Sequence, residues 1–359
     1  MEKIRLGRTG LLVTKTAFGA LPIQRISKAD AVKLVRRACE AGINYFDTAN
    51  MYTDSEEKLG EALHDVRQNV VISTKSGGGD KKTVQAHIEQ SLRSLRTDYI
   101  DLFQFHNPAV LPDIHDPDGP FAAALEAKQK GYIRHIGITN HRLKVAHEAI
   151  ESGNFETLQF PFCYLATEKD LELVELCREH DMGFIAMKGL SGGLLNNAEA
   201  CYAFMQEHPD VVPIWGIQHE WELDQWLELT ERNPRMTPEL QAVIDHDRTE
   251  LSGDFCRSCG YCMSCRGLLP PRRRRHRHPP GGPDGPAAAA GTLQALSERR
   301  VAGEDAPDQK LHPLQRLQVP LSLWAGHPGP AAEAAGGLRR VLRRPSQRLK
   351  RRTPDALPQ

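Results

Sequence analysis

Residues 70–106 contain the pattern that decides the fold: VVISTK (70–75), TVQAHIEQSLRSLR (83–96) and IDLFQFH (100–106). The first and third runs are short and rich in β-branched and aromatic residues, which is typical of strands. The middle run has apolar residues three and four positions apart, the spacing of a half-buried helix. Strand, helix and strand in this order predict two parallel strands joined by a crossover helix.

The same alternation extends over most of the chain. A second helical run, SKADAVKLVRRACEA (27–41), follows the first strand-like run. Eight strand-like runs can be counted: TAFGAL (16–21), NYFDTA (44–49), VVISTK (70–75), IDLFQFH (100–106), IRHIGITN (133–140), TLQFPF (157–162), GFIAMK (183–188) and VVPIWGIQ (211–218). Eight such repeats predict an α/β fold, the (β/α)8 TIM barrel. An open doubly wound sheet ordinarily has a Gly-rich phosphate loop after its first strand, and no GxGxxG sequence stands there.

Polar side chains recur just after these strand-like runs, and in a barrel they would all face the C-terminal mouth, where active sites lie. They are Asp47, Lys75, His106, Asn140, Gln159, Lys188 and Gln218.

Four of the residues near the mouth form a chemically complementary set. Lys75 ends a buried run, where an ammonium needs a partner, and Asp47 is the natural one. Tyr52 lies five residues after Asp47, and a phenol beside an ammonium has its pKa lowered. His106 could orient a substrate carbonyl as a neutral imidazole. Each residue alone is more often structural, but together they predict a proton-donating site for carbonyl reduction.

These motifs resemble the aldo-keto reductase superfamily over about residues 4 to 232. The matching segments are LGRTGLLVTKTAFGALPI (6–23), NYFDTANMY (44–52), STK (73–75), FQFH (103–106), GYIRHIGITNH (131–141), LQFPF (158–162) and MKGLSGGLL (187–195). The resemblance implies that Tyr52 is the general acid, that Lys75 lowers its pKa, that Asp47 holds Lys75 and that His106 orients the carbonyl.

The resemblance also implies a nicotinamide cofactor, NADP or NAD. Thr139 stands where the family often has Ser. Asn140 and Gln159 would bind the nicotinamide carboxamide, while the turn after the seventh strand and the exit of the eighth would hold the pyrophosphate and adenosine. The residues implied there are Lys188, Leu190, Gly192, Gly216 and Gln218. Ordinary turns between strand and helix are the alternative at each of these positions.

Four closely spaced cysteines, Cys256, Cys259, Cys262 and Cys265, lie in CRSCGYCMSC. Their two-residue spacing is close to ferredoxin ligation and predicts a [4Fe–4S] site, with a zinc site or an idle thiol-rich loop as alternatives. The run resembles a subgroup of aldo-keto reductases with a C-terminal two-cluster ferredoxin-like domain. The second ligand run of that domain is absent here.

The tail has a different composition. Residues 1–265 contain 28 Lys and Arg against 39 Asp and Glu, whereas residues 266–359 contain 18 against 7. We expect a disordered Arg/Pro/Ala-rich segment. A frameshift is our leading hypothesis for its origin, because a one-nucleotide shift can turn its leucines into a ferredoxin-spaced cysteine run. Those positions are Leu311, Leu314, Leu317 and Leu321. A nucleic-acid-binding tail is the weaker alternative.

Three regions are therefore expected: a barrel (1–235), a helical linker with the Cys-rich motif (236–266) and the tail (267–359). No stretch approaches the roughly 18 apolar residues of a membrane span, so we expect a cytoplasmic protein. The predicted activity is NAD(P)H-dependent reduction of a small aldehyde or ketone. The alternatives are a non-catalytic, cofactor-binding regulatory barrel and an enzyme whose iron–sulfur relay serves an electron-transfer partner.

Overall fold

The computed structural model describes residues 1–251, and every element reported below lies in that range. The strands are β1 (Lys3–Arg5), β2 (Leu12–Thr14), β3 (Ala17–Gly19), β4 (Tyr45–Asp47), β5 (Val71–Ser76), β6 (Ile100–His106), β7 (Ile133–Thr139), β8 (Thr157–Pro161), β9 (Gly183–Met187) and β10 (Val211–Gly216). The α-helices are α1 (Lys28–Glu40), α2 (Ser55–Leu63), α3 (Lys81–Ser94), α4 (Pro120–Gln129), α5 (Leu143–Ser152), α6 (Glu168–Glu179), α7 (Ala198–Gln206), α8 (Glu220–Arg232) and α9 (Pro238–Glu250). Three 3-10 helices are η1 (Gly7–Thr9), η2 (Pro22–Arg25) and η3 (His64–Asn69).

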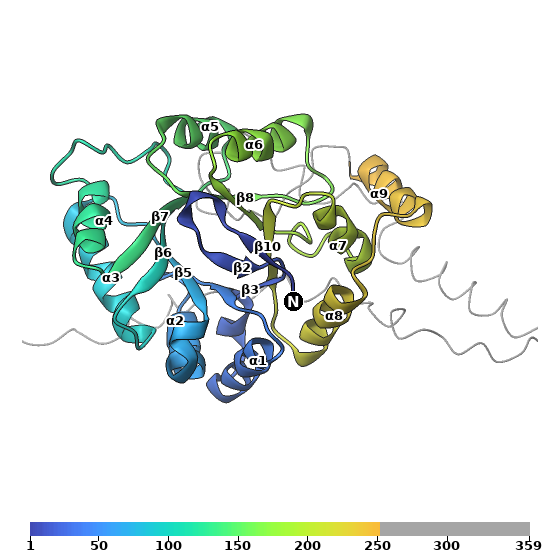
Figure 1. Ribbon diagram of the computed structural model, residues 1–359, viewed down its shortest axis with the longest axis horizontal. Coiled ribbons are helices and arrows are strands. Elements are labelled where there is room, and N and C mark those ends of the chain that lie inside the picture. Colours follow the sequence, from blue (N-terminus) through green and yellow to red (C-terminus); the bar gives the residue numbers. More distant parts are fainter. Residues whose placement is uncertain (252–359) are drawn as a thin grey trace, which may run out of the picture. The chain divides into compact units, whose positions relative to one another are not determined.

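The eight strands β3 to β10 close into a barrel in which every neighbouring pair is parallel. Helices surround the ring of strands (Figure 1). Each of the eight strand-like runs read from the sequence overlaps one of these strands, so the predicted (β/α)8 barrel is confirmed. Parallel strands all leave the barrel at one end, and this places the residues that follow them around a common mouth.

A small antiparallel hairpin, β1 and β2, was not predicted and covers the opposite end of the barrel (Figure 1). Asn44, which precedes β4, accepts a hydrogen bond from Thr14 N at 2.7 Å and donates one to Leu12 O at 2.9 Å. Arg5 pairs with Asp181, which precedes β9, at 2.7 Å. The hairpin therefore contacts the N-terminal ends of the barrel strands and leaves their C-terminal ends for the site.

Side chains alternate between the barrel interior and the helix-covered outside, as the strand repeat requires. Tyr45, Val71 and Leu102 belong to one buried apolar cluster together with Leu6 and Val13 of the hairpin region. The residues next to them in sequence pack in the larger cluster shared with the helices: Phe46, Ile72 and Phe103. Continuing the alternation turns polar residues inward toward the mouth: Asp47, Ser73, Lys75, Gln104 and His106.

Candidate active site

A buried ion pair lies at the centre of the mouth. Lys75 Nζ on β5 donates to Asp47 Oδ2, the last residue of β4, at 2.6 Å and to Thr48 O at 2.5 Å. Lys75 is 1% exposed and Asp47 is 3% exposed. Burial lowers the pKa of the Lys75 ammonium, and the nearby Asp47 carboxylate opposes that shift. The structure thus brings together the two residues that the sequence paired.

Two further groups complete the surroundings of the Asp47 carboxylate. Ser73 Oγ donates to Asp47 Oδ1 at 2.6 Å and accepts from Tyr45 OH at 3.0 Å. Gln104 Nε2 approaches the same oxygen at 3.4 Å. Ser73 and Gln104 were not predicted from the sequence, although each lies two positions before a predicted site residue and therefore on the same inward face.

Tyr52 is held beside this pair by a tight turn between β4 and α2. Tyr52 N donates to Ala49 O at 3.0 Å, Ser55 N donates to Tyr52 O at 2.8 Å, and Thr53 has a left-handed φ of 38°. Lys75 Nζ lies 5.4 Å from the centre of the Tyr52 ring. The Tyr52 ring also meets the His106 ring edge-on, with centroids 5.8 Å apart. The turn therefore places the Tyr52 ring next to both Lys75 and His106.

His106 ends β6 as a neutral imidazole. Burial, and then the positive charge of Lys75, lower its pKa to about 3. Its Nδ1 atom is buried and has no hydrogen-bond partner within residues 1–251. An unpaired buried polar atom is costly, so this nitrogen is a candidate for contact with a bound molecule.

The residues expected around the nicotinamide meet at the ends of β7 and β8. Thr139 and Asn140 are buried, and Asn140 Nδ2 donates to Pro108 O at 2.8 Å. Asn140 Oδ1 accepts from the backbone N–H groups of His141 and Arg142, both at 2.9 Å. Asn140 therefore fixes two loops at the mouth.

The loop after β9 bends through several left-handed residues. Lys188, Ser191, Gly192 and Gly193 have φ values of 60°, 48°, 72° and 93°. Ser191 N donates to Lys188 O at 2.7 Å, and Gly193 N donates to Leu190 O at 2.9 Å. Mixed right- and left-handed backbone of this kind can gather N–H groups into an anion-binding concavity.

At the start of α8, two backbone N–H groups are already hydrogen-bonded to a carboxylate. Gly216 is exposed and Gln218 is half-buried. Glu222 Oε2 accepts from Gln218 N at 2.6 Å and from His219 N at 2.9 Å. Because Gln218 N and His219 N already donate to Glu222, a phosphate bound at this helix start would have to compete with the Glu222 carboxylate for these two donors.

The predicted metal ligands Cys256, Cys259, Cys262 and Cys265 lie outside the described residues. Within residues 1–251, no group of three or more His, Cys, Asp or Glu side chains is arranged to hold a metal ion. In the same range, no helix has both the length and the apolar character needed to cross a membrane.

Comparisons with known proteins show which family the chain is similar to. The model of the "Aldo/keto reductase family" matches residues 15–246. The uncharacterized oxidoreductase YqkF of Bacillus subtilis is 30% identical over 209 residues, covering 54% of this chain and 67% of that protein. L-galactose dehydrogenase of Arabidopsis thaliana is 32% identical over 217 residues, with the same coverage. The NADH-specific methylglyoxal reductase of Escherichia coli is 28% identical, covering 54% and 69%.

Solved structures show the same fold. Aldo-keto reductase AKR11C1 from Bacillus halodurans, in its holo form, has a TM-score of 0.60 at 24% identity and covers 69% of this chain and 96% of its own. An aldo-keto reductase from Klebsiella pneumoniae in complex with NADPH has a TM-score of 0.59 at 21% identity, covering 68% and 94%. Because the family model spans more than half of the 359 residues, the protein belongs to the aldo/keto reductase family of oxidoreductases.

Proposed function

We propose that the protein reduces the carbonyl group of a small aldehyde or ketone with NADPH or NADH, and that Tyr52 donates the proton. The observation that carries this proposal is the buried Lys75–Asp47 pair at 2.6 Å with the Tyr52 ring beside it. The bound dinucleotide supplies the hydride. Every other group that the reaction needs belongs to the mouth of the barrel.

The roles follow from charge and burial. When Tyr52 gives its proton to the substrate oxygen, the phenolate that remains is stabilised by the Lys75 ammonium. Asp47 keeps Lys75 charged although burial alone favours the neutral amine. His106, neutral because its pKa lies near 3, hydrogen-bonds the carbonyl oxygen and orients it without adding a competing charge.

The described residues fit a dinucleotide. In our proposal Thr139, Asn140 and Gln159 bind the nicotinamide carboxamide, and the left-handed loop at Lys188, Leu190 and Gly192 holds the pyrophosphate. Gly216 and Gln218 face the adenosine. Relatives differ in cofactor, since one is named as NADH-specific and one neighbour contains NADPH. Titration with both dinucleotides decides between them.

Replacing Tyr52 by Phe tests the proposal, because it removes the phenol and keeps the ring. We expect cofactor-dependent carbonyl reduction to fall by about 10²–10⁴-fold while dinucleotide affinity stays nearly unchanged. Turnover in a screen of aldehydes is the readout, with fluorescence titration for binding. Dinucleotide binding without turnover in the unmodified protein would instead support the regulatory-barrel alternative.

For the rest of the chain we propose the division into residues 1–235, 236–266 and 267–359, with a [4Fe–4S] cluster at Cys256, Cys259, Cys262 and Cys265. The cluster would pass electrons to a partner protein. Iron and sulfide analysis with an EPR spectrum tests it, and metal-free protein rejects it. The mass of the intact protein, together with the gene sequence around codon 265, tests the frameshift.

A further inference from the structure

Gln104 is an interior glutamine that the reaction as described above does not use. It is completely buried on β6, in register with Lys75 on β5 and with Gly137 on β7. It points inward two positions before His106. Gln104 therefore lies inside the barrel, beneath the mouth and between the two sets of residues assigned to proton donation and to the cofactor.

The Gln104 amide contacts one residue of each set. Its Nε2 donates to Gln159 Oε1 at 2.9 Å and approaches Asp47 Oδ1 at 3.4 Å. The contact with Gln159 is the stronger by distance. Since Gln159 turns its oxygen toward Gln104, its Nε2 points the other way.

The barrel provides space for this amide at Gly137. A Cβ atom at that position would lie 2.0 Å from Thr157 Oγ1 and 3.3 Å from Gln104 Cγ. Gln104 Oε1 is nevertheless buried without a partner in the described part of the chain. An apolar side chain of similar size would avoid that cost, so the hydrogen bonds of the Gln104 Nε2 donor must offset it.

We propose that Gln104 is a positioning residue that fixes the orientation of the Gln159 amide and joins it to Asp47. With its oxygen turned toward Gln104, Gln159 presents its N–H donors to the mouth. It therefore selects an acceptor, the carboxamide oxygen of the nicotinamide. The same Gln104 amide adds a donor to the carboxylate that holds Lys75. This inference rests on the proposed function.

Gln104→Met removes the donors and keeps the size, so it tests the proposal directly. We expect the Kd for the preferred dinucleotide to rise about five- to tenfold, measured by quenching of protein fluorescence, which needs no turnover. Gln104→Asn keeps an amide that is too short to reach Gln159 and is expected to weaken binding similarly. Gln85→Met, on α3 outside the barrel interior, is the matched control.

A double-mutant cycle separates positioning from general structural damage. Gln159→Met should weaken binding by itself, and adding Gln104→Met should then have almost no further effect, because Gln104 acts through Gln159. Unchanged affinity in a folded Gln104→Met protein, or additive losses in the double variant, would overturn the inference. Binding without turnover in the unmodified protein would reject the proposed reduction and leave this cycle readable. Failure of both dinucleotides to bind would reject both.

Discussion

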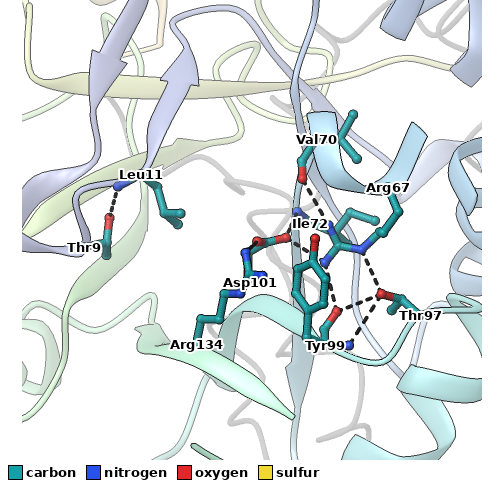
Figure 2. A network of polar contacts seen from close by, with 9 residues as sticks. All are labelled: Thr9, Leu11, Arg67, Val70, Ile72, Thr97, Tyr99, Asp101 and Arg134. Atoms are coloured by element: carbon teal, nitrogen blue, oxygen red, sulfur yellow. Dashed lines mark hydrogen bonds and ion pairs between the residues drawn. The ribbon is translucent and has the colours of Figure 1, made fainter. Parts of the chain in front are cut away.

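Two buried ion pairs lie at opposite ends of the barrel, and they are satisfied to different degrees. At the mouth, Lys75 pairs with Asp47 at 2.6 Å, and near it His106 Nδ1 and Gln104 Oε1 remain without partners among the described residues. At the N-terminal end, Arg67 of η3 pairs with Asp101 of β6 at 2.7 Å (Figure 2). Both pairs are almost fully buried.

At the N-terminal end, by contrast, Arg67 and Asp101 have no buried side-chain atom without a hydrogen-bond partner among residues 1–251. The Arg67 guanidinium donates to Thr97 Oγ1 at 3.0 Å, to Val70 O at 3.0 Å and to Tyr99 O at 2.9 Å, besides Asp101 (Figure 2). Asp101 also accepts from Ile72 N at 3.0 Å and from Arg134 Nη1 at 3.1 Å.

Tyr99 adds aromatic contacts to this network, with Arg67 Cζ at 4.1 Å and Arg134 Cζ at 3.6 Å from the centre of its ring. Figure 2 also shows Leu11 N donating to Thr9 Oγ1 at 3.1 Å in the hairpin segment. A buried network in which every side-chain nitrogen and oxygen has a partner holds structure together, whereas unpartnered polar atoms beside a buried charge are available to a ligand. The comparison therefore supports a structural role for the N-terminal end and the proposed chemistry at the mouth, as is usual in such barrels.

The largest effect on activity is expected from Lys75→Met at the mouth. We expect the turnover number to fall by about a thousandfold, because the Tyr52 phenolate loses its neighbouring cation. Steady-state kinetics with a saturating aldehyde and dinucleotide measure the effect. The variant Asp47→Asn/Lys75→Met, which removes both charges, controls for an unpaired carboxylate. Turnover within threefold of the unmodified protein would contradict the assignment of chemistry to this end.

Arg67→Met at the N-terminal end is expected to do the opposite. It leaves Asp101 buried without its main partner, so the free energy of unfolding should fall by about 3–5 kcal/mol. Urea unfolding followed by circular dichroism measures the loss. Turnover per folded molecule should remain close to that of the unmodified protein. If Arg67→Met left the free energy of unfolding unchanged but lowered the turnover number, the two ends would be coupled.

The sequence predicts much of this molecule because its barrel depends on local patterns. Residues that end neighbouring parallel strands must meet, and so Asp47 and Lys75 could be paired before the structure was known. The hairpin was missed because Lys3–Arg5 and Leu12–Thr14 are too short to show a strand pattern.

Some features of the site were not predicted from the sequence, for two different reasons. Gln104 and Ser73 could have been found by counting inward positions back from His106 and Lys75. The bonds of Asn140 to Pro108 O and to the following backbone could not, since they depend on how two loops meet in space. Likewise, the occupation of the α8 start by Glu222 follows from side-chain geometry that spacing does not reveal.

The two ends of the barrel are also expected to differ, by a smaller amount, in how their stability depends on pH. Burial lowers the pKa of His106 to about 3, against 6.5 for a free histidine, whereas the network in Figure 2 contains no histidine. The unfolded chain therefore binds one more proton at this residue between about pH 6.5 and 3. Stability from the neutral ring is fully present above pH 6.5 and is lost as the pH falls through that window. His141 at the mouth, whose pKa is also lowered to about 3 by burial, adds to the loss.

His106→Gln should remove one of these two contributions. Between pH 6 and 4 we expect the free energy of unfolding to fall by about 1 kcal/mol per pH unit less than in the unmodified protein. His64→Gln, on the exposed surface of η3, is the matched control, and urea unfolding at half-unit pH steps is the measurement. Equal slopes for His106→Gln and the unmodified protein would show that the imidazole is protonated in the folded state. The buried ring would then be charged at pH 4 to 6, and burial would not be the cause of a neutral ring at the mouth.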